Sequence, residues 1–74
     1  MGRIIGGLLR ELRKAERRLR HAQSYRTHLA GDAPQYERAA VTRRIYVAQR
    51  YVADLKTAVD RLRQVSGLPA LFAK

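Results

Sequence analysis

Arginines repeat through the first third of the chain at a spacing that places many of them on one side of a helix. Six cations fall within eleven residues: Arg10, Arg13, Lys14, Arg17, Arg18 and Arg20. Only Glu11 and Glu16 oppose them in this segment, and the whole chain of 74 residues has a formal net charge of +10. Guanidinium groups bind phosphate and carboxylate oxygens in pairs. A positive field of this density predicts a polyanion, an acidic protein surface or an anionic membrane as the partner.

The other side chains capable of chemistry form no catalytic or metal-binding pattern. His21 and His28 are seven residues apart, about two helical turns, whereas two histidines that share a metal on one helix stand four residues apart. The chain has no Cys, and its carboxylates beyond residue 30 form no recognisable ligand set. No Ser-His-Asp arrangement and no Gly-rich phosphate loop is evident. We therefore expect a protein that is not an enzyme and that uses no metal or cofactor.

The length of the chain predicts one small domain, residues 1–74. A chain of this size buries only about 60% of the surface that its unfolded form exposes, so a monomer is expected to be marginally stable. Without Cys there are no disulfides, which fits a reducing compartment and leaves self-association as a source of stability. No segment approaches the ~20 apolar residues of a membrane-spanning helix. We expect a cytoplasmic protein.

Apolar residues recur in the first half with the 3-4 spacing of a packed helical seam, which predicts a helix over about 3–30. The seam positions are Ile5, Leu8, Leu12, Ala15, Leu19, Ala22, Arg26 and Leu29, of which only Arg26 is polar. Gly6 and Gly7 each cost ~1 kcal/mol relative to Ala inside a helix. They leave open a helix that begins at Leu8, with residues 1–7 frayed or docked on a partner. We expect Gly31 to cap the C-terminal end.

The second half repeats the pattern, which predicts a helix over about 33–66. Its seam positions are Val41, Ile45, Ala48, Val52, Leu55, Val59 and Leu62. At its start, Asp32 is the expected N-cap, with Gln35 three residues on and Pro34 in the first turn. Ser66, Gly67, Leu68 and Pro69 predict its end, with glycine in the left-handed conformation followed by an apolar residue and a proline.

Two helices joined by about four residues predict an antiparallel hairpin, and so an all-α fold. A weaker apolar stripe follows the second helix: Ala40, Val47, Tyr51, Ala58 and Val65. Together with the seam it makes an apolar arc wider than one partner helix covers. We therefore expect two hairpins to form a homodimeric four-helix bundle, with Val47 and Tyr51 in the interface. The alternative is that both are ordinary, partly exposed residues.

The cations of the first helix lie opposite its seam and so are expected to face outward. The residues that we expect to contact a nucleic acid or an acidic partner are Arg3, Arg10, Arg13, Lys14, Arg17, Arg20, Arg43, Tyr46 and Arg50. Tyr46 is the outward aromatic residue that could stack on an unpaired base or lie in a protein interface. A charged stripe can also be a plain solvated face, but like charges three or four residues apart repel one another. A helix that keeps so many like charges despite this repulsion is more typical of one that contacts an anionic partner.

Residues near the turn and the C-terminus carry further expectations. Tyr25 and Tyr36 flank the turn and are expected to close that end of the bundle. Arg26 is expected either to extend its charge to the surface or to pair with a carboxylate such as Glu37. The apolar tail, residues 67–74, presents Leu68, Leu71 and Phe72 as candidate protein-interface residues. It is either a staple onto its own bundle or a ligand for a groove in a partner.

These features predict a small basic binding protein that contacts the nucleic-acid backbone, RNA or DNA, through its arginine-rich helix. The predicted architecture resembles that of the small plasmid regulator Rop, a helical-hairpin dimer that binds RNA through one polar face. The likeness is one of architecture and length. The alternative is an adaptor or inhibitor, of the kind that phage and mobile elements encode, which docks its basic face and apolar tail on an acidic host protein. Attachment to a membrane surface is less favoured, because the apolar seam is already used between the helices.

Overall fold

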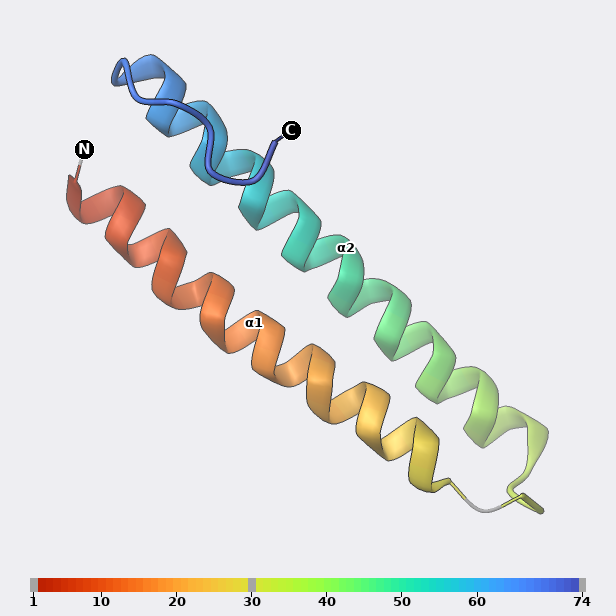
Figure 1. Cartoon of the computed structure of the whole chain (residues 1–74). Helices are drawn as coiled ribbons and strands as arrows, with labels where there is room; N and C mark the ends of the chain where they lie inside the picture. Colours follow the sequence, from red (N-terminus) through yellow and green to blue (C-terminus); the bar gives the residue numbers. More distant parts are fainter. Residues whose placement is uncertain (1, 30, 74) are drawn as a thin grey trace.

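The computed structural model is a pair of antiparallel helices that lie side by side along most of their length (Figure 1). It describes residues 2–29 and 31–73. Helix α1 spans Gly2–His28 and helix α2 spans Gln35–Val65. The described residues contain no strand, and the molecule measures 52 × 19 × 16 Å. The predicted all-α hairpin is confirmed.

The core is the seam between the two helices. The buried apolar side chains are Leu12, Ala15, Val41, Ile45, Val52, Leu55 and Val59. At the centre, Leu8 and Leu19 pack against a cluster formed by Leu12, Ala15, Val52 and Leu55. Every one of these residues is a predicted seam position. The 3-4 spacing therefore identified the packed face of both helices, because residues three and four apart share one side of a helix.

Gly6 and Gly7, which left open a helix beginning at Leu8, lie inside the first turns of α1. The helix begins at Gly2 and continues through Gly6 and Gly7. Residues 2–7 are therefore helical and not frayed, which contradicts the alternative of a frayed segment over residues 1–7. Met1 lies outside the described residues. Pairing along α2 is what offsets the low helix propensity of glycine, since Ile5 and Leu8 are partly buried there.

The turn between the helices differs from its prediction. Helix α1 ends at His28, before Gly31, so Gly31 is not its C-cap. Helix α2 begins at Gln35 with Pro34 as N-cap and with no side-chain cap, so the predicted capping by Asp32 was wrong. The ring of Pro34 disfavours helical backbone at Ala33. That restriction explains why α2 starts at Gln35 and not at residue 33. Helix α1 starts one residue before its predicted range of 3–30 and ends two residues before the end of that range.

Backbone hydrogen bonds to the carbonyl of Pro34 take the place of the predicted capping box. Its carbonyl accepts the N–H of Glu37 at 3.0 Å and that of Arg38 at 3.2 Å. The guanidinium of Arg38 also donates to the carbonyl of Gly31 across the turn. The turn is thus closed by α2's own first residues rather than by an acidic N-cap.

The end of α2 is the predicted glycine-capped turn. Gly67 has φ 80°, a left-handed conformation that glycine adopts without a Cβ clash. The N–H of Leu68 donates to the carbonyl of Arg63 at 2.8 Å, and that of Gly67 to the carbonyl of Gln64 at 3.0 Å. These two bonds define a Schellman motif. The chain then turns back along α2 as a C-terminal tail (Figure 1).

Candidate binding surfaces

The outward face of α1 carries a continuous row of cations, which we call the α1 basic stripe: Arg3, Arg10, Arg13, Lys14, Arg17 and Arg20. All six side chains are exposed. Within the described part of the chain, no carboxylate forms an ion pair with any of them. A hollow of about 240 Å³ lies at the C-terminal end of the stripe, lined by Arg17, Arg20, His21 and Ser24. The stripe is thus a solvent-facing positive surface with its charges available to a partner.

Of the candidate contact residues of α2, Tyr46 and Arg50 lie on its outward face, and Arg43 lies where that face meets a cavity on one side of the hairpin. Arg43, Tyr46 and Arg50 are exposed, and the guanidinium of Arg50 lies 3.8 Å from the carboxylate of Asp54. Because the seam separates the two helices, residues opposite the seam on α1 and on α2 point away from each other. The hairpin therefore divides the predicted contact residues between two edges of the molecule instead of gathering them into one site.

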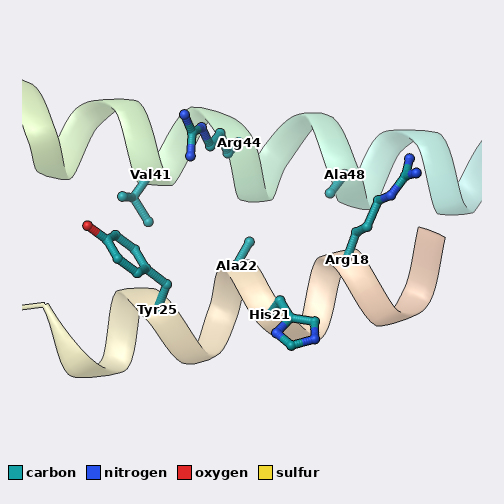
Figure 2. A pocket seen from close by; sticks show the side chains of 7 residues that line it. All are labelled: Arg18, His21, Ala22, Tyr25, Val41, Arg44 and Ala48. Carbon is teal, nitrogen blue, oxygen red and sulfur yellow. The ribbon is translucent and has the colours of Figure 1, made fainter. Parts of the chain in front are cut away.

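Two neighbouring cavities lie along one side of the hairpin, between the helices. Arg18, Arg44 and Ala48 line both of them. The first has a volume of about 500 Å³ and is further lined by His21, Ala22, Tyr25 and Val41. Figure 2 shows Arg18 reaching toward α2, and the small side chains Ala22 and Ala48 between the helices. The small residues Ala22 and Ala48 at seam positions were the one feature of the sequence that pointed to this depression.

The second cavity has an apolar floor and an arginine rim. It has a volume of about 510 Å³ and is lined by Ala15, Arg18, Ala40, Arg43, Arg44, Val47, Ala48 and Tyr51. The side chain of Val47 is 59% exposed and that of Tyr51 is 42% exposed. The second apolar stripe of α2 is thus open to solvent over much of its length.

Tyr51 connects the two helices at the edge of this cavity. Its hydroxyl donates a hydrogen bond to Oε1 of Glu11 at 3.2 Å. Burial raises the pKa of Tyr51, and the hydrogen bond to Glu11 and the negative charge of Glu11 raise it further, against a smaller opposing effect of Arg18. The hydroxyl therefore stays protonated and fixes Glu11 at one end of the cavity.

The aromatic residues at the turn behave differently from one another. The hydroxyl of Tyr25 donates to Oε1 of Glu37 at 3.3 Å and so joins the two helices there. Tyr36 is 77% exposed and does not close the turn. Glu37 accepts the hydrogen bond from Tyr25, and among the described residues Arg26 forms no ion pair with Glu37. The side chain of Arg26 is exposed, which is the first of the two expected arrangements.

The tail is attached to its own helix by a buried carboxylate, Asp60, which is 7% exposed. The carboxylate accepts the backbone N–H of Leu71 at 2.8 Å, of Phe72 at 3.1 Å and of Ala73 at 2.8 Å. Burial by itself would raise the pKa of Asp60, but these three donors and the nearby charge of Arg63 lower it overall. The carboxylate is therefore held in its charged form.

Two cations on the same face of α2 complete the attachment. Nε of Arg63 donates to the carbonyl of Pro69 at 2.8 Å, and Nζ of Lys56 lies 5.6 Å from the centroid of the Phe72 ring. Of the two roles considered for the tail, the structure has the staple. The side chains of Leu68, Leu71 and Phe72 nevertheless remain exposed. Sequence reasoning missed Asp60, although its placement four residues after Lys56 and three before Arg63 puts all three on one side of the helix.

No group of three His, Cys, Asp or Glu side chains in the described residues is arranged to hold a metal ion. Nor does either helix, over its described length, have the length and apolar character needed to cross a membrane. No protein-family model matches the chain, and neither the curated proteins nor the solved structures contain a significant match to it.

Proposed function

We propose that the chain is a non-enzymatic, cytoplasmic binding protein whose α1 basic stripe contacts the phosphate backbone of a nucleic acid. The observation that carries this proposal is a row of six exposed cations without a carboxylate partner on the described chain. A helix whose charges serve only solubility gains from pairing Glu with Lys or Arg at i,i+4. Glu16 stands four residues before Arg20, but within the described residues no ion pair forms between them. The six positive charges of the α1 basic stripe are therefore left for a polyanion to neutralise.

The dimensions of the stripe fit this partner. At a rise of 1.5 Å per residue, Arg3 and Arg20 stand roughly 25 Å apart along the helix axis. One strand of a B-form duplex places about seven phosphates in that distance. Each phosphate that a cation neutralises releases condensed counterions, so the affinity arises from a salt-dependent, sequence-independent term.

The architecture favours contact with the backbone over readout of bases. The axes of the two antiparallel helices run side by side (Figure 1). Neither helix projects from the other as the recognition helix of a DNA-binding helix-turn-helix does. Tyr46, the outward aromatic residue of α2, is exposed and would stack on a base only where a strand is unpaired. We further propose that two hairpins assemble as a four-helix bundle, because Val47 and Tyr51 expose apolar surface that one hairpin leaves uncovered.

The competing candidate is an adaptor or inhibitor that docks on an acidic protein. It is favoured by the exposed apolar side chains of Leu68, Leu71 and Phe72, which lie next to the cations Lys56 and Arg63. Affinity capture from a lysate with and without nuclease separates the two candidates. Loss of the captured material after nuclease treatment supports nucleic acid, and retention of an acidic protein supports the adaptor.

The proposed contact is tested by measuring binding to a duplex DNA and to a double-stranded RNA over a range of salt concentrations. For wild type we expect the logarithm of the affinity to fall steeply and linearly with the logarithm of the salt concentration. Reversal of Arg10, Arg13 and Arg17 to Glu should abolish binding at moderate salt while circular dichroism shows unchanged helicity. A triple Arg→Lys variant should keep a salt slope close to that of wild type, because it retains the three charges.

A single reversal provides the matched positional control. Arg13→Glu and Arg61→Glu change the net charge equally, and both residues are exposed. Arg13→Glu should reduce the magnitude of the salt slope by about one, and Arg61→Glu should change it little. Equal effects of the two variants, or a flat salt response of wild type, would contradict a contact centred on α1.

A further inference from the structure

One side of the hairpin keeps an apolar strip that nothing in the described chain covers. We call it the groove face. Its apolar residues are Ala40, Val47 and Tyr51 of α2, its charged residues are Glu11 and Arg18 of α1 and Arg44 and Asp54 of α2, and the buried Ala15 lies beneath it. The tail does not reach it. The tail anchors Lys56 and Asp60 stand nine residues after Val47 and Tyr51, which is about two and a half helical turns and so the opposite side of α2.

We propose that a second copy of the chain covers the groove face. The two copies are related by a two-fold axis that lies between them, perpendicular to the helix axes, at the level of Ala15 and Val47. Ala15 is the middle residue of α1, and Val47 lies close to the middle of α2. Both line the same cavity and so stand at about the same height along the hairpin. An axis at this height lets two hairpins overlap along almost their whole length.

The charges of α1 become complementary under this symmetry. Glu11 precedes Ala15 by about one turn, and Arg18 follows it by about one turn on the same side of the helix. Rotation about a perpendicular two-fold axis inverts the position of each residue along the helix axis, measured from Ala15. Glu11 of each copy therefore stands opposite Arg18 of the other. The hydrogen bond from Tyr51 uses Oε1 of Glu11, which leaves Oε2 for the guanidinium of the second copy.

The charges of α2 follow the same rule. Arg43 and Arg44 precede Val47 by about one turn, and Asp54 follows it by two turns on the groove face. Asp54 already lies 3.8 Å from Arg50 of its own helix through Oδ1. After the two-fold rotation its carboxylate also lies within about one turn of Arg43 and Arg44 of the other copy. The long arginine side chains span that offset, so both helices place carboxylates against guanidiniums.

The other two-fold arrangement of the same faces is disfavoured. An axis parallel to the helices preserves height and stacks α1 of one copy on α2 of the other. Arg18 and Arg44 stand at the same height, since both line the two cavities. Each Arg18 would then oppose an Arg44, twice per dimer, and like charges facing one another across an interface destabilise it. The charge pattern thus selects the perpendicular axis.

The face has the size and composition for this contact. The hairpin is 52 Å long and 19 Å wide, which is enough for the roughly 800 Å² per partner of a standard interface. Ala40 and Ala48 present small side chains that allow close approach of a neighbouring helix, because the distance between helix axes depends on the side chains at the contact. Val47 and Tyr51 supply the larger apolar side chains.

The symmetry also bears on nucleic-acid binding, and this consequence rests on the proposed function. A perpendicular axis stacks α1 on α1 of the second copy, which brings the two α1 basic stripes to one edge of the four-helix bundle. A nucleic acid there would meet both stripes side by side. A dimer with the parallel axis would instead separate them to opposite edges.

The test is a charge-swap experiment on the oligomeric state, without nucleic acid. Light scattering and sedimentation of wild type should give the mass of a dimer. Glu11→Arg and Arg18→Glu should each raise the dimer dissociation constant by about tenfold or more, since each variant alone opposes like charges twice. An equimolar mixture should recover dimers, because in the mixed pair both contacts join opposite charges.

Arg20→Glu is the matched control, since it removes an exposed cation of α1 that lies off the groove face, and it should leave dimerisation unchanged. Circular dichroism verifies that each variant is helical. A wild-type monomer at high micromolar concentration overturns the proposal, and so does a mixture that is no more dimeric than its two components. A monomer that still binds nucleic acid would refute the dimer alone, and a dimer that does not bind it would refute the proposed function alone.

Discussion

Asp60 shows how one carboxylate fixes the course of an entire segment. Three consecutive backbone N–H groups of the tail converge on it, and such charge-assisted bonds are stronger than neutral ones. Residue type alone did not reveal this role, because an Asp on the outward side of a helix normally faces solvent. Its burial depends on the tail's return after Gly67, a long-range feature that helical periodicity does not encode.

Acidification should release the tail. The folded-state pKa of Asp60 is lower than that of an unfolded aspartate, about 3.9. The stabilising contribution is therefore complete above that value and is lost as the pH falls through the folded-state pKa. Amide hydrogen exchange of Leu71, Phe72 and Ala73 should accelerate as the pH is lowered below about 4, after correction for the intrinsic pH dependence of exchange.

Asp60→Asn should have the same effect at neutral pH. The amide removes the negative charge and turns one acceptor oxygen into a donor group, so protection of the three tail amides should fall by about tenfold or more. Asp32→Asn, an exposed carboxylate in the turn, is the control and should leave the tail protected. Unchanged protection in Asp60→Asn would show that the apolar contacts of the tail hold it without the carboxylate.

At the scale of the helices, the spacing of apolar residues predicted the packed faces but not the helix ends. Leu12, Val52 and Val59 are buried as their seam positions require. The Schellman turn at Gly67 was also predictable, since the glycine-Leu-Pro order is local. The start of α2 was not, because Asp32 and Pro34 gave competing signals and the steric restriction before proline prevailed. The end of α1 at His28 had no local sequence signal.

Alanine at Gly6 or Gly7 should stabilise the hairpin. Both glycines lie inside α1, and a Cβ added at either position would meet no atom within 4 Å. Each change should raise the free energy of unfolding by about 0.5–1 kcal/mol, because alanine loses less backbone freedom on folding. Urea unfolding monitored by circular dichroism measures this.

A matched change at Gly67 should do the opposite. Gly67→Ala also adds one methyl group in open space, but φ at this position is 80°, where a Cβ is strained. We expect it to destabilise by about 1 kcal/mol. Destabilisation by Gly6→Ala or Gly7→Ala would show that the first turns of α1 are not helical in solution.

At the scale of the whole molecule, the basic, the exposed apolar and the tail-covered surfaces lie on different sides of the hairpin. The α1 basic stripe faces one edge, the groove face lies along one side, and the tail covers the opposite side of α2. Sequence analysis predicted the stripe from residue spacing, and it predicted exposed apolar surface at Val47 and Tyr51. It grouped Arg43, Tyr46 and Arg50 with the stripe, and the pairing of the two helices is what separates them.

The most direct measurement of the central claim is a nuclear magnetic resonance titration of the full chain with a short duplex. The arginine Nε–Hε signals report each guanidinium separately. Contact through α1 should shift the signals of Arg10, Arg13 and Arg17 first, with those of Arg50 and Arg61 changing little at the same ratio. Shifts confined to α2 or to the tail, or no shifts at low salt, would contradict binding by the α1 basic stripe.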